Sequence, residues 1–576
     1  MPSIFRSRTL IATGLLVAVS TVAQVTTQSQ VAQPSPATLV LRNGSIVTAD
    51  DARPTAQAMA VNGDTIVALG TNAEIARYVG PNTQVIDLAG QMAMPGFVES
   101  HAHFNGIGQA KLGLELMSTT SWEQIVGMVR DAAAKARPGQ WIVGRGWHQE
   151  KWTSVPQPNV AGFPLHEALS AASPNNPVVL THASGHASFA NAKAMELSNL
   201  TGKTAAPAGG EILKDKAGNP TGLLNETAMG LIRRGAGEPP PTAEEREAEA
   251  MKVIDLASQE IVSKGVTSFQ DAGSSFQDVE RFKRAIDTGV LKARLWVMIR
   301  GGGTPEQLAK GRLIDYGNKH LTVRAIKISV DGALGSRGAW MLAPYSDLVS
   351  SSGLGRDLNP ARATAQLAID HGYQLCLHAI GDRANREVLN VFEEAFRKNN
   401  RNGKDLRWRV EHAQHIHRDD IPRFGQLGVI AAMQGVHATS DAPYVTTRLG
   451  AERAEEGAYV WQKLMQSGAV VANGTDAPVE DVDPIASYYS TVTRKTNDGK
   501  EFYPGQKMSR IDGLKSYTLW AAYAGFEEHI KGSLTPGKLA DITILTKDIT
   551  RVPDNEIRDA KVAYTIVGGK VVYKGQ

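Results

Sequence analysis

Two histidines one residue apart close an apolar stretch near the beginning of the chain. The segment MPGFVESHAH spans residues 94–103 and contains His101 and His103. In an extended strand, side chains at positions i and i+2 point to the same face, so both imidazoles can approach one metal ion. Neutral imidazole is the commonest metal ligand among side chains. A lone His-x-His pair is a weak signal, and its weight depends on the residues further along the chain.

Further side chains of the same chemical character occur where later apolar runs end. They are Lys327 in KISVDG, His378 in LHAIGD, His412 in VEHAQ and Asp476 in NGTDAP. A histidine at the end of a strand is more often a structural residue held by hydrogen bonds than a ligand. Four histidines, one lysine and one aspartate in equivalent places are much harder to explain by packing, so the pattern predicts a metal site.

Eight short apolar segments in the middle of the chain would carry these residues. They span residues 97–101, 265–270, 294–299, 323–330, 374–378, 407–411, 429–433 and 469–473. Amphipathic helical stretches separate most of them, and strands that alternate with helices predict a (β/α)8 TIM barrel in an α/β fold. The carboxyl ends of the strands meet at one mouth of such a barrel, which would bring the six candidate ligands together.

Other parts of the chain complete the expected organisation. The interval between the first and second barrel strands is too long for one helix, so we expect an inserted subdomain at about 105–259 within a barrel of residues 96–529. Short strands with Asn-Gly turns before the barrel, and short strands around Gly568-Gly569 after it, predict a β-sandwich domain from both termini. Its two parts are residues 38–95 and 530–576.

The N-terminus has the pattern of a secretory signal. Arg6 and Arg8 precede an apolar run over 10–23, and a tract rich in Gln, Ser, Thr and Pro comes next. This pattern predicts a signal peptide over 1–23 and a linker over 24–37. A membrane anchor is the alternative, but the run is shorter than the roughly 20 residues that a span needs. We therefore expect cleavage, no stable membrane insertion afterwards, and a periplasmic or secreted protein.

Composition narrows the classes of partner and ligand. The chain has 576 residues, with 61 Lys and Arg against 58 Asp and Glu and no long charged run, which argues against nucleic acid as a partner. The single cysteine, Cys376, excludes an intrachain disulfide framework and a Cys-rich zinc site. Metal ligands must therefore come from His, Asp, Glu or Lys. The sequence is compatible with a homo-oligomer and does not determine the oligomeric state.

Taken together, the motifs resemble the amidohydrolase superfamily, and within it the amidohydrolase-3 branch, which includes N-substituted formamide deformylases and YtcJ-like proteins. The resemblance covers nearly everything after the signal peptide. It rests on MPGFVESHAH, KISVDGALGSR, HAIGDRA, VEHAQ, NGTDAPV and GSLTPGKLADITIL. It implies a barrel with a small β-sandwich and a metal-dependent hydrolase acting on carbon-nitrogen bonds other than peptide bonds.

The resemblance also implies a ligand set. One metal would be bound by His101, His103 and Asp476, and a second by His378 and His412. Lys327 would bridge the two ions after reacting with carbon dioxide to form a carbamate, a carboxylated lysine, because an unmodified lysine is a cation and cannot bind a metal. Two zinc ions per chain are expected on ligand type, with Mn, Ni or Co as other divalent ions that accept these ligands. A single ion is the main alternative, with Lys327 then paired to a carboxylate such as Asp331.

The expected reaction comes from the ligands. Metal-activated hydroxide would attack the carbonyl of an amide, N-formyl or cyclic amide substrate, with Asp476 as general base and then general acid. Trp147, His186 and Arg337 are the candidate substrate contacts, although Trp147 could equally serve packing and Arg337 a structural ion pair. Two other functions stay open: a mononuclear deaminase or cyclic-amidase, and a non-catalytic periplasmic barrel that binds a small molecule.

Overall fold

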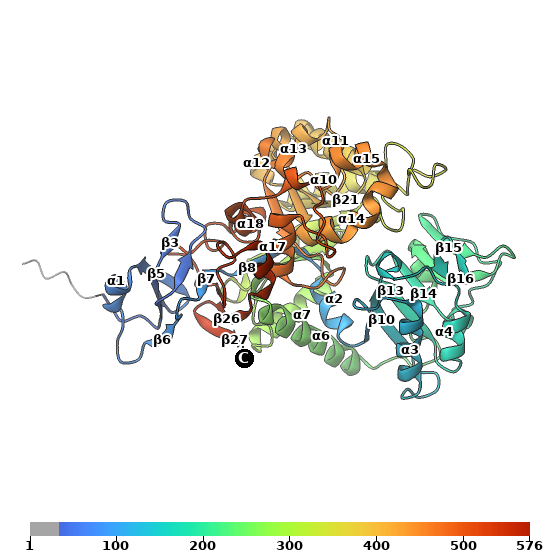
Figure 1. Ribbon diagram of the computed structural model, residues 1–576, viewed down its shortest axis with the longest axis horizontal. Coiled ribbons are helices and arrows are strands. Elements are labelled where there is room, and N and C mark those ends of the chain that lie inside the picture. Colours follow the sequence, from blue (N-terminus) through green and yellow to red (C-terminus); the bar gives the residue numbers. More distant parts are fainter. Residues whose placement is uncertain (1–33, 576) are drawn as a thin grey trace, which may run out of the picture. The chain divides into compact units, whose positions relative to one another are not determined.

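Eight parallel strands form the centre of the computed structural model, which describes residues 34–575 (Figure 1). In chain order they are β8 (Phe97–Ala102), β17 (Val266–Ser274), β18 (Arg294–Arg300), β20 (Leu321–Ser329), β21 (Gln374–Ala379), β22 (Arg409–His412), β23 (Ile430–Gln434) and β24 (Val471–Gly474). Each strand pairs in parallel with the next. The predicted barrel is confirmed, and each of the eight predicted segments coincides with one of its strands.

Backbone hydrogen bonds bring the first and last barrel strands together at the mouth. The amide of Asp476 donates to the carbonyl of His101 at 2.8 Å, and the amide of His103 donates to the carbonyl of Ala477 at 2.7 Å. A short strand, β19 (Leu313–Asp315), adds antiparallel to β20. The barrel is therefore nearly closed where the predicted ligands of β8 and of the segment after β24 meet.

Helices cover the outside of the barrel. The main ones are α6 (Ala243–Ser263), α7 (Phe276–Asp287), α8 (Pro305–Gly311), α10 (Asn359–His371), α11 (Asp382–Lys398), α13 (Ile421–Leu427), α14 (Gly435–Leu449), α15 (Ala451–Gly457), α16 (Trp461–Gln466), α17 (Pro484–Thr493), α18 (Arg510–Ser516) and α19 (Leu519–Ala524). In α11 the apolar residues recur with helical spacing, so Val388, Leu389 and Phe392 are buried against the sheet. Thr242 and Glu245 form a capping box that begins α6.

The interval between the first two barrel strands contains a sheet of its own. Its order is β15 (Gly210–Lys214), β16 (Pro220–Glu226), β14 (Ala187–Ala190), β13 (Val178–His182), β10 (Ile142–Trp147) and β9 (Leu114–Glu115). Helices α3 (Trp122–Ala133), α4 (Glu167–Ala172) and α5 (Ala192–Leu197) accompany it. This sheet and its helices, which we call the insertion, lie within the predicted interval. That interval also holds α2 (Phe104–Ala110) and most of α6, where Gly108 lets the two helices touch because a Cβ there would lie 2.0 Å from the carbonyl of Val253.

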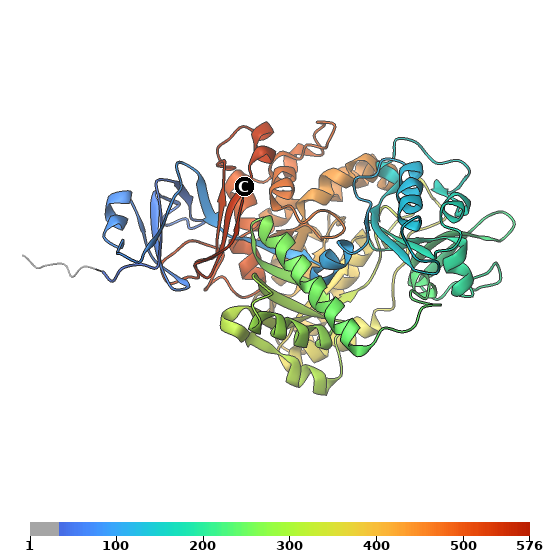
Figure 2. The same cartoon turned by 90° about the horizontal axis from the view of Figure 1, so that it is seen from below.

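Strands from both ends of the chain build the β-sandwich. One sheet has the order β5 (Thr65–Gly70), β4 (Ala58–Asn62), β1 (Leu39–Arg42) and β6 (Gln84–Asp87). The other runs β27 (Lys570–Lys574), β26 (Val562–Val567), β25 (Ile542–Leu545), β7 (Met92–Pro95), β2 (Ser45–Val47) and β3 (Thr55–Ala56). The antiparallel pair β7 and β25 joins the two ends, as Figure 2 shows for the blue and red strands. The predicted β domain from both termini is confirmed.

The described part of the chain begins after the predicted signal peptide. The predicted signal peptide at 1–23 and most of the predicted linker lie outside the described residues. Between residues 34 and 575, no helix has the length and apolar character needed to cross a membrane.

A buried ion pair connects the barrel to the β domain. Arg294, at the start of β18, binds Asp541 through Nε at 2.7 Å and through a terminal nitrogen at 3.0 Å, and both side chains are at most 4% exposed. Burial raises the pKa of Asp541, but the charge and hydrogen bonds of Arg294 more than offset this and hold it below its ordinary value. The pair therefore stabilises the fold while Asp541 is ionised.

Asp541→Asn is expected to lower the free energy of unfolding by about 3–5 kcal/mol, because Arg294 is left buried without its partner. A carboxyl with a depressed folded pKa contributes stability above its unfolded pKa of about 3.9 and loses it as pH falls further. Thermal unfolding measured by circular dichroism should show the largest gap between variant and wild type near pH 7 and a narrowing gap below about pH 4. The exposed pair Lys193–Glu196 supplies the control, since Glu196→Gln should cost under about 1 kcal/mol. A gap that does not change with pH would contradict this account.

Candidate metal centre

Asp476 is the carboxylate around which the predicted ligands gather. It lies just after β24, and its Oδ1 is 3.2 Å from Nε2 of His103 and 3.5 Å from Nε2 of His101. Its Oδ2 is 3.9 Å from Nδ1 of His412, the last residue of β22. Three histidines from two strand ends therefore share one aspartate at the barrel mouth.

The histidine rings continue from one strand end to the next. The ring centroids of His101 and His412 are 4.6 Å apart, and those of His412 and His378 are 4.4 Å apart. Nitrogen or oxygen atoms of His101, His412 and Asp476 all lie within 4.8 Å of one another, and all three side chains are buried. This spacing suits ligands of one ion, with His378 placed beside them.

Unpartnered polar atoms show that these residues fit a metal. His101 Nε2, His378 Nε2 and Asp476 Oδ1 are buried and have no hydrogen-bond partner in the described part of the chain. A buried polar atom without a partner costs free energy, so such atoms are rare in folded proteins. A divalent cation would satisfy all three, because neutral imidazole nitrogen and carboxylate oxygen are the donors that zinc accepts.

A second layer of side chains orients the ligands. Nδ1 of His101 is hydrogen-bonded to Glu411, whose carboxylate also accepts a 3.0 Å hydrogen bond from Arg409. Nδ1 of His412 lies 2.9 Å from Oε1 of Gln434. A metal-binding histidine usually donates its other ring N–H to such an acceptor, which fixes the tautomer. Glu411 and Gln434 were not predicted as site residues, although Glu411 stands immediately before His412 in VEHAQ.

Burial keeps the histidines in the form that binds metals. Desolvation, with a smaller contribution from the charge of Lys327, lowers the pKa of His101 to about 4. Desolvation also places the pKa values of His378 and His412 well below the ordinary histidine value. All three imidazoles are therefore neutral at neutral pH, and a neutral nitrogen has the lone pair that coordination needs.

Asp476 has the opposite tendency. Burial raises its pKa, but interactions with the nearby side chains of His103, His412 and His101 more than offset this and hold it well below the ordinary value. An ionised carboxylate is thus placed among neutral histidines. This combination provides a negative ligand for a cation and an oxygen that can accept a proton.

Lys327 lies on β20, buried and only 3% exposed. Desolvation lowers its pKa to about 8, against the opposing charge of Glu411. Asp331, the carboxylate expected as its partner in a site with one ion, is engaged elsewhere: it accepts hydrogen bonds from the backbone amides of Ile380 and Gly381 at 3.0 and 2.8 Å. Lys327 therefore has an amine that loses its charge easily, which a carbamate-forming lysine requires.

Backbone strain is concentrated at the same place. His412, Ala413 and Asp476 have φ values of 77°, 44° and 58°, which L-residues seldom adopt. Strained backbone of this kind persists where the surrounding structure enforces it and is common at functional sites. Gly474 contributes by its small size, because a Cβ there would lie 2.2 Å from Oε1 of Glu99.

The three predicted substrate contacts have different surroundings. His186, from the insertion, lines the pocket beside the ligands, and its ring centroid is 5.6 Å from that of His378. Trp147 is 1% exposed, donates from Nε1 to the carbonyl of Leu180 at 2.9 Å, and belongs to the apolar core of the insertion. Arg337 pairs with Asp347 at 2.8 Å. The structure thus brings His186 to the ligand cluster. Trp147 is packed in an apolar core and Arg337 is in an ion pair, which are the alternative roles considered for these two residues.

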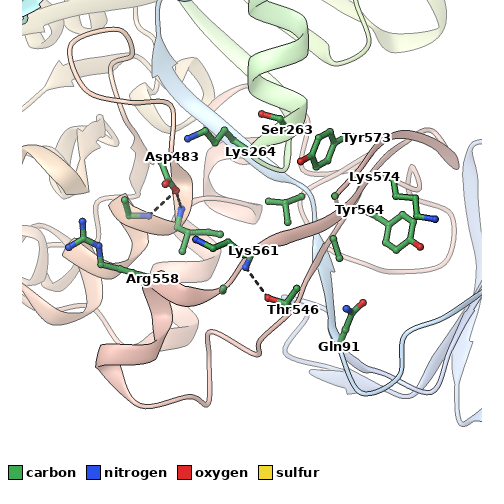
Figure 3. A pocket seen from close by; sticks show the side chains of 16 residues that line it. Gln91, Ser263, Lys264, Asp483, Thr546, Arg558, Lys561, Tyr564, Tyr573 and Lys574 are labelled. Atoms are coloured by element: carbon green, nitrogen blue, oxygen red, sulfur yellow. Dashed lines mark hydrogen bonds between the residues drawn. The ribbon is translucent and has the colours of Figure 1, made fainter. Parts of the chain in front are cut away.

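A larger cavity lies elsewhere in the molecule. It has a volume of about 690 Å³ and is lined by residues of β26, β27 and the end of α6 (Figure 3). Its cations do not converge, since Arg558 and Lys574 lie at opposite ends of the view, and Lys264 is bound by Asp481 at 2.7 Å. The pocket at the barrel mouth, with its unpartnered ligand atoms, is the better candidate for chemistry.

Comparison with known proteins agrees with this geometry. The model of the amidohydrolase family Amidohydro_3 matches residues 84–573. The chain belongs to this family. It is 32% identical over 558 residues to Protein LONG AFTER FAR-RED 3 of Arabidopsis thaliana, covering 93% of this chain and 92% of the relative. It is 29% identical to putative amidohydrolase YtcJ of Bacillus subtilis, covering 86% and 92%, and 25% identical to N-substituted formamide deformylase of Arthrobacter pascens, covering 93% and 98%.

A solved structure supports metal-dependent hydrolysis as the general function of this amidohydrolase. The crystal structure of an uncharacterized metal-dependent hydrolase from Pyrococcus horikoshii matches with a TM-score of 0.69 and 25% identity, covering 90% of this chain and 99% of that one. The predicted resemblance is confirmed. The chain is a metal-dependent hydrolase of the amidohydrolase superfamily.

Proposed function

We propose that this amidohydrolase cleaves the carbon-nitrogen bond of a small amide, N-formyl or cyclic amide substrate. The observation that carries the proposal is the pair of unpartnered atoms His101 Nε2 and Asp476 Oδ1, which face each other at 3.5 Å in a buried mouth. His101, His103 and Asp476 would hold one ion, and His378 and His412 a second, with Lys327 between them as a carbamate. A divalent ion there supplies Lewis acidity, which polarises a carbonyl and makes water nucleophilic at neutral pH.

Asp476 moves the proton in this proposal. Its carboxylate would accept a proton from the attacking water and then donate that proton to the amine nitrogen as the C–N bond breaks. The backbone hydrogen bond from Asp476 to His101 and the 3.2 Å contact with His103 hold the carboxylate in place. His101, His378, His412 and Asp476 are buried, which limits competition from bulk water for these groups.

The relatives support an amide substrate. One of them is named for deformylation of N-substituted formamides, a reaction that breaks an amide C–N bond. His186 is the side chain of the insertion that we propose as a substrate contact. The roles of Trp147 and Arg337 as direct contacts stay predictions.

A mononuclear deaminase or cyclic-amidase is the second candidate. The spacing of His101, His412 and Asp476 within 4.8 Å favours it, because these three residues would suffice to hold one ion. The two candidates differ in the number of ions and in the role of Lys327.

Metal content tests both candidates. The protein is purified without chelators and with bicarbonate, and its metals are measured by plasma mass spectrometry and compared with hydrolysis of a panel of amides, formamides and cyclic amides. We expect two ions per chain and turnover of an acyclic amide. One ion with turnover of a cyclic amide or an amino-substituted ring would support the second candidate. A protein that binds no metal even after reloading would overturn both.

We also propose that the protein is exported after removal of residues 1–23. The support is the basic and apolar pattern of the sequence itself. Expression of the full chain in a Gram-negative host and N-terminal sequencing of the product test this proposal. A mature N-terminus near residue 24 in the periplasmic fraction is expected, whereas an intact Met1 in the cytoplasm would contradict it.

A further inference from the structure

The insertion carries a histidine-carboxylate pair of its own beside the metal ligands. Nδ1 of His186 lies 3.0 Å from both carboxylate oxygens of Glu226. His186 immediately precedes β14 and Glu226 ends the antiparallel strand β16, and the amide of Glu226 donates to the carbonyl of His186 at 2.8 Å. Backbone and side chain together therefore bind Glu226 to His186.

The position of Glu226 is fixed from several sides. Its side chain is 6% exposed, and its backbone adopts φ 54° and ψ −127°, an unfavourable conformation for a residue with a side chain. Two glycines of the barrel loop after β20 make room for the carboxylate, because a Cβ on Gly332 or Gly338 would lie 2.3 or 2.8 Å from its Oε1. The carboxylate thus fills a cradle formed by the barrel, and the pair is complete only where the insertion meets that loop.

This contact determines which nitrogen of His186 remains for a ligand. An ionised carboxylate only accepts hydrogen bonds, so the nitrogen next to it, Nδ1, carries the proton in the neutral ring. Nε2 then has a free lone pair and is a hydrogen-bond acceptor. His186 lines the same pocket as His378, His412 and Asp476.

We propose that Glu226 is a positioning residue that holds His186 in the Nδ1–H tautomer, so that His186 Nε2 accepts a hydrogen bond from the N–H of the substrate amide. This inference rests on the proposed amide hydrolysis. With Nε2 of His186 as the acceptor, the site would favour substrates that have an N–H on the scissile amide over tertiary amides, which have none. A site built to bind an N–H discriminates against an analogue without one, because the acceptor then loses that hydrogen bond.

The kinetic experiment compares four proteins on two probes. Wild type, His186→Asn, Glu226→Gln and the double variant are assayed with N-benzylformamide and with N-benzyl-N-methylformamide. Each single variant should lower kcat/KM for the secondary amide by about 10- to 100-fold and reduce the preference over the tertiary amide. The double variant should be no worse than His186→Asn, because Glu226 acts through His186.

Glu211→Gln is the matched control. Glu211 stands on the neighbouring strand β15 and binds the side-chain amide of Asn225 at 2.9 Å, with no histidine contact among the described residues. Glu211→Gln should leave kcat/KM for both formamides, and the preference for the secondary amide, unchanged. Additive losses in the double variant, or an unchanged preference in Glu226→Gln, would overturn the proposal. So would loss of bound metal in His186→Asn or Glu226→Gln, since His186 would then be a metal ligand.

Nuclear magnetic resonance separates this inference from the proposed reaction. In protein labelled with ¹⁵N-histidine, long-range proton-nitrogen correlations show which nitrogen of His186 is protonated, and His186→Asn identifies its signals. Wild type should show Nδ1–H with an unprotonated Nε2, and Glu226→Gln should shift these signals. A predominant Nε2–H tautomer would overturn the proposal even if amides are hydrolysed. If wild type turns over none of the amides, the proposed function fails, and the tautomer still decides the role of Glu226.

Discussion

Asp476→Asn is expected to lower kcat by about 10²- to 10⁴-fold, the range that general acid-base groups contribute. Asparagine keeps the size of the side chain and one oxygen, but it cannot accept the water's proton or return it to the leaving amine. The neighbouring side chains are no equivalent replacement, because His101 and His412, which lie 3.5 and 3.9 Å from its oxygens, are themselves candidate metal ligands. The measurement is steady-state turnover of the amide that wild type hydrolyses best, at saturating metal.

Asp481→Asn is the control for this change. Asp481 stands later in the same loop, is 55% exposed and pairs with Lys264 rather than with a histidine. Its removal should leave kcat unchanged. If Asp476→Asn keeps more than about a tenth of wild-type kcat with full metal content, Asp476 is a ligand without a role in proton transfer.

The barrel and the cluster of candidate ligands could be predicted because their signals are local. His101 and His103 stand two residues apart at the end of one apolar segment, and amphipathic helical stretches separate most of the eight segments. The spacing therefore indicates the strands, and the segment ends indicate the barrel mouth. The β-sandwich was predictable from Asn-Gly turns in the N-terminal part and short strands at both ends, whereas the pairing of β7 with β25, which shows that the ends meet, comes from the structure.

The supporting residues could not be predicted in the same way. Glu411 and Gln434 each touch a histidine from a different strand or from far along the chain, and nothing in their own neighbourhood marks that contact. Glu226 lies at the end of a strand of the insertion, and its role depends on two glycines more than a hundred residues later. Arg337 stands in a motif of the barrel mouth, but its partner Asp347 is in the next part of the loop. Long-range partners of this kind are determined by the fold rather than by sequence spacing.

If Lys327 is the proposed carbamate between two ions, Lys327→Met is expected to remove one of them and to lower kcat/KM by more than about 100-fold, because both ions would lose a ligand. The reason lies in the burial of the amine. With its pKa lowered to about 8, roughly a tenth of Lys327 is uncharged at pH 7, far more than of an ordinary lysine, and the uncharged amine can attack carbon dioxide. The new N–C bond forms as the nitrogen loses a proton, and the carbamate oxygens then replace a cation by an anion among the histidines. Native mass spectrometry of wild type should show the added mass of one carbon dioxide, which Lys327→Met lacks.

Lys531→Met separates this effect from the general cost of removing a buried lysine. Lys531 is 2% exposed, and its amine binds Glu527 at 2.7 Å and Ser268 at 2.6 Å. Lys531 therefore has a carboxylate partner, whereas Asp331 is bound by backbone amides instead of pairing with Lys327. Its loss should reduce stability and leave metal content intact. If Lys327→Met instead keeps its metal and loses only stability, Lys327 is structural and the mononuclear site of His101, His412 and Asp476 accounts for the chemistry. The number of ions in these two variants therefore decides between the two mechanisms that the geometry of the mouth allows.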